Sequence, residues 1–345
     1  MPPTVGYTST VLMMEAVLPV GIVVLNWSNA PDTIRCLESL LSVESDDFRL
    51  YLVDNGSPDG SAAGLLDWLS VYWQRGDVRV YSETLEQRRG PCPATLIRLD
   101  QNLGYAGGNN AGIKLALAEG CDAVWILNND TTVAPDTIGL LRNASFGDHA
   151  GVVGCCVLEQ ESPDVVQSLG GGRYCWWRTT SQPVGQALAY REALGARTEK
   201  LNYVCGAAML IPESTVARVG LLNEAFFLYC EEIDYAERCK VAGLRLAVEP
   251  RVRIWHSLGG TIGSSRSLAT RSRTSVFHGC RSALIVVALY RLPLLPVAIA
   301  MRIGFALRLL GRGQPRLARA AVGGILDGLV SIPSALRHRP SSIGS

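Results

Sequence analysis

Four short runs of apolar residues recur in the first 130 positions, and each run ends at a cluster of polar residues. Runs that are apolar throughout, instead of alternating with polar residues, are typical of strands buried on both faces of a parallel sheet. Segments with apolar residues at helical spacing lie between them. The pattern predicts strands at residues 19–25, 48–53, 94–99 and 123–127, and helices at residues 31–41, 62–73 and 111–119.

This alternation of strand and helix predicts an α/β fold: a doubly wound, Rossmann-like and mainly parallel sheet with helices on both faces. In such sheets, ligands bind where the carboxyl ends of the strands meet. Asp54, residues 102–110 and residues 128–130 all follow predicted strands. The pattern therefore predicts a binding site at this edge of the sheet, before any family is considered.

The regular alternation of predicted strands and helices ends near Gly151. Buried strands are predicted at residues 152–154 and 204–212, and residues 245–256 form either a strand pair or one bent strand. A short helix is predicted at residues 213–219, and a second helix begins near Glu231 and continues to about residue 242.

The last part of the chain combines apolar runs with arginine. Residues 283–290 and 292–299 are strongly apolar, and neither run reaches the roughly 20 residues that a membrane-spanning helix needs. We interpret the pattern as helices that lie in the interface of a membrane, with arginine side chains reaching toward anionic headgroups. The alternative is a helical unit that packs on a partner subunit. The arginines are Arg302, Arg308, Arg312, Arg316 and Arg319.

Composition agrees with a large fold that has an unusual surface. Apolar residues make up 48% of the 345 positions and charged residues 18%, below the roughly 25% of an average soluble domain. The formal net charge is +1, so no global field attracts nucleic acid. The 10 cysteines are scattered without a C-x-x-C pair, which is typical of reduced apolar fillers in a cytoplasmic protein. The start of the chain lacks a convincing signal peptide, and Met13 or Met14 are alternative start positions.

Two acidic clusters are candidates for chemistry. Asp130, which follows two asparagines, provides a carboxylate that can share a divalent cation with phosphate groups, although the same residues make a good turn and helix cap. Glu231, Glu232 and Asp234 open a predicted helix directly after an aromatic segment. They either stabilise the helix dipole or supply a general base whose pKa is shifted by a neighbouring acid. No P-loop or hydrolase nucleophile elbow accompanies these clusters.

Taken together, these segments resemble family 2 glycosyltransferases of the GT-A fold, in the branch that contains bacterial rhamnosyltransferases. The resemblance covers residues 20–263, followed by a C-terminal helical segment. Six modest motifs occur in the expected order, and that order makes the resemblance specific. They are residues 23–27 (VVLNW), 53–57 (VDNGS), 102–112 (NLGYAGGNNAG), 127–131 (LNNDT), 226–234 (FFLYCEEID) and 255–256 (WH).

The resemblance implies a role for each matching residue. Nucleotide-sugar binding falls to the ends of the first strands, to the glycine-rich loop of residues 104–110 and to the two asparagines before the metal ligand: Asn26, Trp27, Asp54, Asn102, Gly104, Gly107, Asn109, Asn128 and Asn129. Asp130 and His256 would coordinate Mg²⁺ or Mn²⁺ on the donor diphosphate. Glu232 matches the catalytic base, flanked by Glu231 and Asp234.

Two positions depart from the family pattern. Asn128 stands where relatives carry aspartate, so compensation of the metal's charge would rest on Asp130 and the diphosphate. Glu232 stands where relatives usually carry aspartate, and this leaves both Glu232 and Asp234 as candidate bases.

The resemblance also implies a division of the chain. Residues 1–18 are an N-terminal extension, and residues 19–270 are the GT-A domain, with a nucleotide-binding half (19–150) and an acceptor half (151–270). Residues 271–345 are a helical tail that meets a membrane or mediates homo-oligomers.

The expected activity is an inverting, metal-dependent transfer of a sugar from a nucleotide diphosphate to a glycan or lipid-linked hydroxyl in cell-wall or polysaccharide synthesis. The favoured donor is dTDP-rhamnose, with UDP- and GDP-linked sugars open. The expected location is the cytoplasm, at the inner face of the plasma membrane. A sugar nucleotidyltransferase and a catalytically inactive scaffold protein are the competing hypotheses.

Overall fold

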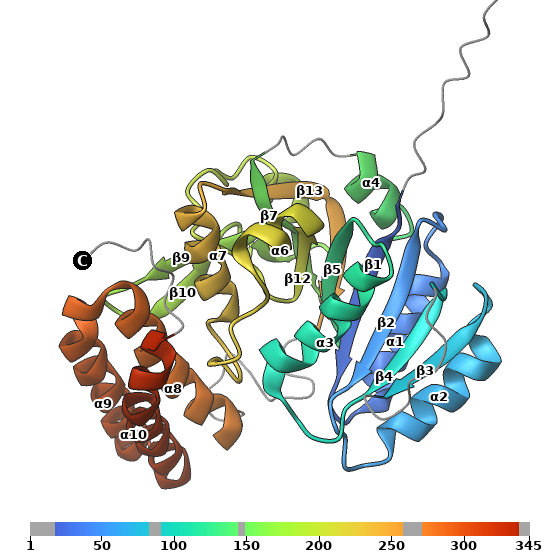
Figure 1. Ribbon diagram of the computed structural model, residues 1–345. Helices are drawn as coiled ribbons and strands as arrows, with labels where there is room; N and C mark the ends of the chain where they lie inside the picture. The colour runs from blue at the N-terminus through green and yellow to red at the C-terminus, as the bar shows by residue number, and fades with distance from the viewer. Residues whose placement is uncertain (1–17, 83–90, 144–148, 258–270, 338–345) are drawn as a thin grey trace, which may run out of the picture.

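The computed structural model describes residues 18–82, 91–143, 149–257 and 271–337, which form one α/β body with a helical end (Figure 1). Residues 1–17, and with them nearly all of the expected N-terminal extension, lie outside this description, as do residues 258–270. The strands are β1 (Val20–Asn26), β2 (Phe48–Asp54), β3 (Val78–Ser82), β4 (Ala94–Arg98), β5 (Ala123–Asn128), β6 (Thr131–Val133), β7 (Ala150–Glu159), β8 (Val166–Leu169), β9 (Gly171–Cys175), β10 (Thr180–Pro183), β11 (Tyr203–Val204), β12 (Ala208–Pro212) and β13 (Arg245–His256).

The helices fall into three groups along the chain. Those of the first half cover the two faces of the parallel strands, α7 follows the aromatic segment, and the last three form the helical end (Figure 1). They are α1 (Ala30–Leu41), α2 (Ser61–Tyr72), α3 (Gly104–Ala118), α4 (Thr137–Asn143), α5 (Tyr190–Ala193), α6 (Glu213–Val219), α7 (Glu231–Val241), α8 (Arg273–Tyr290), α9 (Leu295–Gly311) and α10 (Pro315–Arg337), with a 3-10 turn at Leu292–Leu294.

The central sheet confirms the predicted α/β class. Within the described residues its order is β3-β4-β2-β1-β5-β12-β7-β13-β6, with β8 paired to β7. The strands from β3 to β5 are all parallel, as expected for β-α-β units. The second half departs from this pattern because β12 runs antiparallel between β5 and β7. The sheet is therefore mixed, and β3 is an edge strand that the apolar pattern did not predict.

The glycine-rich segment of residues 104–110 is helical, which corrects the prediction of a loop. The helix α3 begins at Gly104, and glycines further along it let it approach the sheet closely. A Cβ at Gly108 would lie 2.4 Å from the Leu25 side chain, and a Cβ at Gly112 would lie 2.5 Å from the Val23 side chain. Part of the motif that suggested a nucleotide-binding loop thus serves helix-to-sheet packing.

In the second half, residues 245–256 form one strand, β13, with register shifts against β7. The structure thus selects the bent strand over the strand pair. The predicted helix at residues 213–219 is confirmed as α6, and the helix that begins at Glu231 is confirmed as α7. A small sheet, β10-β9-β11, lies beside α7 and the C-terminal helices (Figure 1).

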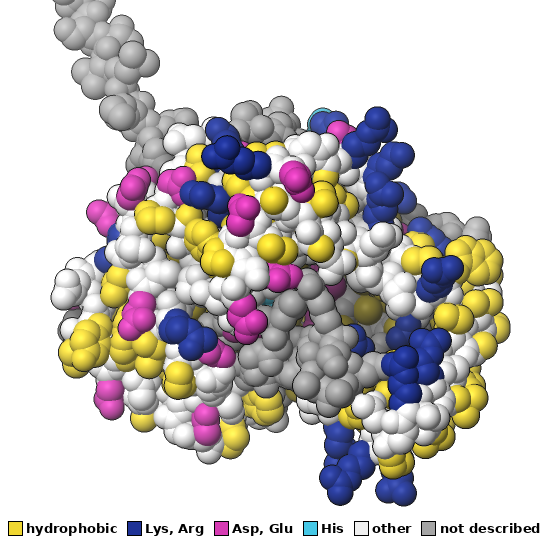
Figure 2. Space-filling model, turned by 180° about the vertical axis from the view of Figure 1, so that it is seen from behind, with side chains coloured by type: hydrophobic (Ala, Val, Ile, Leu, Met, Phe, Trp, Pro, Cys, Tyr) yellow, Lys and Arg dark blue, Asp and Glu magenta, His cyan; other side chains and the backbone are white. Residues whose placement is uncertain are grey.

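The C-terminal helices divide into a buried one and two exposed ones. Residues 283–290, expected at a membrane interface, lie at the end of α8 and are buried, because α8 packs between the α7 region and α10. By contrast, α9 and α10 keep large apolar side chains at the surface, among them Leu307 at 62% and Val330 at 80% exposure. Hydrophobic and arginine side chains gather on this part of the molecule (Figure 2).

In the described part of the chain, two segments are long and apolar enough to cross a membrane, judged by length and composition alone: Leu292–Gly311 and Pro315–Arg337. The apolar run of residues 292–299 therefore belongs to a longer helical segment than the sequence pattern marked out, because α9 continues past Arg302 and Arg308 to Gly311.

Candidate functional site

The register of the parallel strands places three predicted site residues at the same edge of the sheet. Asn26 at the end of β1 pairs with Asp54 at the end of β2, and Leu25 pairs with Asn128 at the end of β5. The Asn26 amide donates to Asp54 Oδ1 at 2.8 Å, and the Thr33 hydroxyl donates to Asn26 Oδ1 at 2.7 Å. A polar floor therefore joins the carboxyl ends of β1 and β2 to the start of α1.

Asn129 extends this floor toward β5, because its amide donates to Thr33 Oγ1 at 2.9 Å. On the opposite side, Ser57 Oγ accepts hydrogen bonds from the Asn26 amide at 3.1 Å and from the Ser28 N–H at 2.8 Å. Trp27 lies between Asn26 and Ser28 in the sequence, and its side chain is half-buried. Ser28 has a φ of 60°. Asn26, Asp54 and Asn129 therefore belong to one hydrogen-bonded cluster, whereas no hydrogen bond joins the Asn128 side chain to it.

A second polar cluster holds the start of α3. The Asn55 amide donates to Asn102 Oδ1 at 3.0 Å and to the Gly104 carbonyl at 3.1 Å, while Asn55 Oδ1 accepts from the Leu103 N–H. Gly104 has a φ of 74°, and a Cβ there would lie 2.4 Å from the Phe227 carbonyl oxygen. This contact brings α3 against the aromatic segment that precedes α7.

The other predicted residues of α3 are buried within the helix. A Cβ at Gly107 would meet Leu103 at 2.7 Å. The Asn109 amide donates to the Tyr105 carbonyl at 2.9 Å, and its Oδ1 atom is buried without a hydrogen-bond partner. Packing explains Gly107, and the structure does not bring Gly107 or Asn109 into the cluster of Asn26 and Asp54.

The acids Glu231 and Glu232 open α7 directly after a strained turn. Tyr229 and Cys230 have φ values of 70° and 71°, a left-handed conformation that costs a non-glycine residue about 1–2 kcal/mol. Glu231 is buried and its Oε1 atom has no hydrogen-bond partner, while Glu232 is half-buried. The turn therefore holds two carboxyl groups side by side in a poorly solvated place.

Burial is the main cause of the raised pKa values of Glu231 and Glu232. It raises the pKa of Glu232 to about 7, partly offset by a backbone hydrogen bond at the start of the helix and then by a hydrogen bond with the Glu231 side chain. Burial and the charge of Glu232 also raise the pKa of Glu231 well above its usual range. A carboxylate that titrates near neutral pH is well matched to general base catalysis.

Asp234 lies apart from this pair. Its carboxylate is 1% exposed and accepts hydrogen bonds from Arg238 Nε and from the Tyr290 hydroxyl, both at 2.8 Å. A carboxylate held by an arginine and a tyrosine is an anchor between helices, not a base open to substrate. Between the two candidate bases left open by the sequence, the geometry favours Glu232.

Asp130 and His256 are neighbours, although 126 positions separate them in the sequence. Asp130 Oδ1 lies 3.2 Å from His256 Nε2 at the ends of β5 and β13. The other ring nitrogen, Nδ1, is 2.9 Å from Gln167 Oε1, and the Gln167 amide donates to the His256 carbonyl oxygen at 2.7 Å. Gln167 Oε1 can only accept, so a hydrogen of the imidazole lies on Nδ1; the neutral ring then turns its Nε2 lone pair toward Asp130, whereas a protonated ring donates from Nε2 to Asp130.

This arrangement fits a divalent cation. Two acceptor atoms that face each other are stabilised by a cation that both can bind, and neighbouring ligands of an octahedral ion with bonds of about 2.1 Å lie about 3 Å apart. Gln167 supplies the outer hydrogen bond that fixes a metal-binding imidazole. No cluster of three or more His, Cys, Asp or Glu side chains that could hold a metal occurs among the described residues. Asp130 and His256 are thus two side chains on which such an ion could rest.

Tyr105 connects the acids with the candidate metal ligands. Its hydroxyl donates to the Gly206 carbonyl at 2.5 Å. Burial, followed by the charges of Glu231 and Glu232 and then that of Asp130, raises the pKa of Tyr105 well above its usual range. Both acidic clusters thus act on one side chain, so they belong to the same region of the molecule.

Several of these residues were missed by sequence reasoning: Thr33, Asn55, Ser57, Tyr105 and Gln167. Asn55, Ser57 and Tyr105 lie inside motifs that the resemblance quoted, and this position was the available signal. Gln167 gave no signal, because β8 reaches His256 only through the folded sheet.

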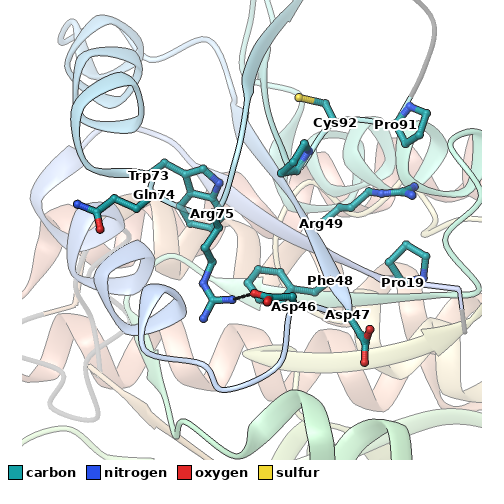
Figure 3. A pocket seen from close by; sticks show the side chains of 11 residues that line it. Pro19, Asp46, Asp47, Phe48, Arg49, Trp73, Gln74, Arg75, Pro91 and Cys92 are labelled. Carbon is teal, nitrogen blue, oxygen red and sulfur yellow. Dashed lines mark hydrogen bonds and ion pairs between the residues drawn. The ribbon is translucent and has the colours of Figure 1, made fainter.

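A separate pocket of about 670 Å³ lies at the opposite edge of the sheet, near the start of β2 and the end of α2 (Figure 3). Arg75 crosses it and pairs with Asp46 at 2.6 Å, as the dashed line shows. Arg75 also donates to the carbonyl oxygens of Leu41 and Ser45, so its guanidinium is engaged in joining segments of the protein. None of the predicted site residues lines this pocket.

Residues 20–191 match the family described as Glycosyl transferase family 2. The low-salt glycan biosynthesis hexosyltransferase Agl10 of Haloferax volcanii is 29% identical over 143 residues, covering 40% of this chain and 44% of that protein. The match thus spans less than half of that relative. The N-acetylglucosaminyl-diphospho-decaprenol L-rhamnosyltransferase of Mycobacterium tuberculosis is 25% identical over 281 residues, covering 76% of this chain and 84% of that protein.

Two solved structures share the fold. The mannosyltransferase PcManGT from Pyrobaculum calidifontis, in complex with GDP-Man and Mn²⁺, has a TM-score of 0.52 and 14% identity, covering 90% of this chain and 86% of that one. GalNAc-T7 with UDP, GalNAc and Mn²⁺ has a TM-score of 0.57 and 13% identity, covering 94% of this chain and 59% of that one. These likenesses show the fold, which is GT-A, as the sequence predicted.

Proposed function

This chain belongs to glycosyl transferase family 2 and is a glycosyltransferase, and we propose that it transfers a sugar from a nucleotide diphosphate to a hydroxyl with inversion at the anomeric carbon. The observation that carries this proposal is the pair Glu231 and Glu232, whose pKa values are raised by burial in the same region as Asp130 and His256. A base and a place for a diphosphate are the two parts that the reaction requires.

The donor would bind at the carboxyl edge of β1, β2 and β5. Asn26, Asp54 and Asn129 form the polar floor there, and Trp27 offers a flat apolar surface for a nucleotide base. Asp130 and His256 would hold Mg²⁺ or Mn²⁺, which when bound stabilises the charge of the departing diphosphate. The Mn²⁺ in both structural neighbours, with GDP-Man in one and UDP and GalNAc in the other, supports this assignment.

Glu232 would act as the general base. Its carboxylate accepts the proton of the acceptor hydroxyl while that oxygen bonds to the anomeric carbon, and the bond from this carbon to the diphosphate oxygen breaks. The products are the glycosylated acceptor and the nucleoside diphosphate. Burial, followed by the charge of Glu232, raises the pKa of Glu231 well above its usual range, and in its protonated form Glu231 can donate a hydrogen bond to the Glu232 carboxylate.

We favour dTDP-rhamnose as the donor and a lipid-linked glycan as the acceptor, with UDP- and GDP-linked sugars as the competing donors. The M. tuberculosis relative, an L-rhamnosyltransferase named for a decaprenol-linked substrate, supports this choice. The fold admits other donors, since the structural neighbours hold GDP-Man and UDP.

We also propose that the protein acts at the cytoplasmic face of the plasma membrane through α9 and α10. Arg302 donates to the carbonyl oxygens of Thr179 at 2.6 Å and Arg178 at 3.1 Å, which ties the middle of α9 to the turn after β9. A helix fastened in this way lies on the protein and turns its exposed face outward. Its apolar residues and arginines favour contact with an anionic lipid surface over a crossing of the bilayer.

The test is transfer of radiolabelled sugar from dTDP-rhamnose, UDP- and GDP-linked donors to lipid-linked acceptors, with and without EDTA. We expect transfer from one donor, its loss in EDTA and its recovery with Mn²⁺ or Mg²⁺. The Glu232→Gln variant should retain a fraction of about 10⁻² to 10⁻⁴ of the turnover. Undiminished transfer in EDTA would exclude the metal role of Asp130, and full turnover by Glu232→Gln would exclude it as the base. Nucleotide-sugar binding without transfer by the wild type would favour a scaffold protein.

A further inference from the structure

The turn that carries Glu231 and Glu232 is held from one side by α8. The Arg281 guanidinium donates to the Ala225 carbonyl oxygen at 2.7 Å, and the Ser282 hydroxyl donates to the Leu228 carbonyl oxygen at 2.8 Å. The Tyr229 hydroxyl lies 2.8 Å from Ser275 Oγ. Three polar side chains of one helix thus contact the segment that leads into the acids.

The same helix also fixes the start of α7. The Tyr290 hydroxyl donates to Asp234 Oδ1 at 2.8 Å, and Arg238 Nε donates to Asp234 Oδ2 at the same distance. Asp234 is two residues beyond Glu232 on the first turns of α7. Contacts from α8 therefore lie on both sides of the strained residues Tyr229 and Cys230 along the chain.

Arg281 also connects the turn with α10, which belongs to the exposed C-terminal pair. Its Nε donates to Asp327 Oδ1 at 2.5 Å, and its other terminal nitrogen donates to Ser331 Oγ at 3.2 Å. α10 lies very close to α8 here, since a Cβ at Gly324 would be 2.1 Å from the Phe277 carbonyl oxygen. One guanidinium therefore joins α8 to two other segments, the stretch before α7 and α10.

We infer that Arg281 and Tyr290 are positioning residues, through which α8 holds the turn so that Glu232 reaches the acceptor hydroxyl. This inference rests on the proposed role of Glu232 as the base. Two left-handed residues in succession relax toward ordinary conformations unless their surroundings hold them. Polar contacts to the carbonyl oxygens before the turn, and to Asp234 after it, provide that restraint. A displacement of about 1 Å at the reacting groups costs up to about 100-fold in rate, so the restraint acts on turnover.

The experiment compares Tyr290→Phe, Arg281→Lys and Arg281→Met with the wild type, using the full-length protein. Tyr290→Phe keeps the ring and removes the hydroxyl that contacts Asp234. Tyr72→Phe, at a half-exposed tyrosine on α2, is the matched control. The measurements are kcat, the donor KM, the melting temperature and amide hydrogen exchange in peptides that cover residues 224–234 and 48–54.

We expect Tyr290→Phe and Arg281→Met to lower kcat by about tenfold while the donor KM stays within twofold of the wild type. Exchange should be faster in peptide 224–234 and unchanged in peptide 48–54, and Arg281→Lys should recover part of kcat because it keeps one donor. Tyr72→Phe should match the wild type throughout.

Unchanged exchange in peptide 224–234, or faster exchange with unchanged kcat, would overturn the inference. So would a loss of kcat that occurs together with a general fall in melting temperature and faster exchange in both peptides. Because exchange needs no substrate, it tests the restraint even where the wild type transfers no sugar, and the two proposals fail separately.

Discussion

Glu232 and Glu231 form a pair of neighbouring carboxyl groups whose pKa values are both raised by burial. The base must be ionised to accept a proton. Since the pKa of Glu232 is raised to about 7, its active form is lost as the pH falls below that value. We therefore predict that kcat/KM declines about tenfold per pH unit below about pH 6.5 and reaches a plateau above about pH 7.5.

The measurement is a pH–rate profile at saturating metal. The residual activity of Glu232→Gln should lack this acidic limb, because the titrating group is gone. A wild-type profile that is flat between pH 5 and 7 would contradict the assignment.

Gln167 is the residue to change for a test of the cation site without direct loss of a ligand. Gln167→Leu removes the acceptor for His256 Nδ1 and leaves Asp130 and His256 in place. Loss of such an outer hydrogen bond typically weakens metal binding 10- to 100-fold. We expect the Mn²⁺ concentration that gives half-maximal thermal stabilisation, in the presence of a nucleoside diphosphate, to rise by about that factor. The control is Gln182→Leu, at an exposed glutamine on β10.

At the residue scale, the sequence allowed us to predict site residues only where a motif or a predicted strand end marked them. Asn26, Asp54, Asp130 and His256 could be named because each follows a predicted strand or matches a motif. The choice between Glu232 and Asp234 could not be made, because it depends on Tyr290, 56 positions beyond Asp234. The side chain of a distant helix converts one of two similar acids into an anchor.

At the scale of elements, the close approach of α3 to the sheet depends on glycine. An alanine at Gly112 would place its Cβ 2.5 Å from Val23 Cγ1, whereas a Cβ at Gly64 in the exposed part of α2 meets nothing within 4 Å. We predict that Gly112→Ala lowers the free energy of unfolding by about 1–3 kcal/mol through overpacking. Gly64→Ala should raise it by about 0.5–1 kcal/mol through the unfolded state.

Urea denaturation of both variants measures these changes, and the opposite signs make each variant the control of the other. Equal effects would show that α3 can move away from β1 at little cost.

The elements themselves were largely predictable, because continuous apolar runs mark the parallel strands. The two features that the apolar pattern did not predict have a common cause. β12 joins the sheet antiparallel, and α3 begins seven residues before the predicted helix at residues 111–119. Both depend on what lies across the sheet or against the helix, and this information is absent from local periodicity. Glycine near a polar cluster was interpreted as loop, whereas here it brings two elements together.

At the scale of the whole molecule, the exposed face of α10 carries Val322, Leu326 and Val330 at helical spacing. A charge at its most exposed position should oppose insertion into the lipid interface. We predict that Val330→Glu weakens binding to vesicles that contain anionic lipid by at least tenfold. Val71→Glu, at a residue of α2 that is 67% exposed, should leave it unchanged. Cosedimentation with vesicles measures both, and binding should weaken as salt rises.

Equal binding by the wild type and Val330→Glu would point to a protein partner, or to a second copy of this chain, as the occupant of this face. Sequence reasoning placed the apolar tail at a membrane as a whole. The structure divides it, because α8 fills the space between α7 and α10 and the later helices keep the exposed surface.

The left-handed conformation of Cys230 has a consequence for directed evolution. Glycine adopts such a backbone without steric cost, so a library selected only for heat tolerance should accept glycine at this position, limited by the loss of the buried thiol. Glycine would also widen the range of conformations open to the turn beside Glu232. Selection for heat resistance and selection for turnover should therefore favour different residues at position 230.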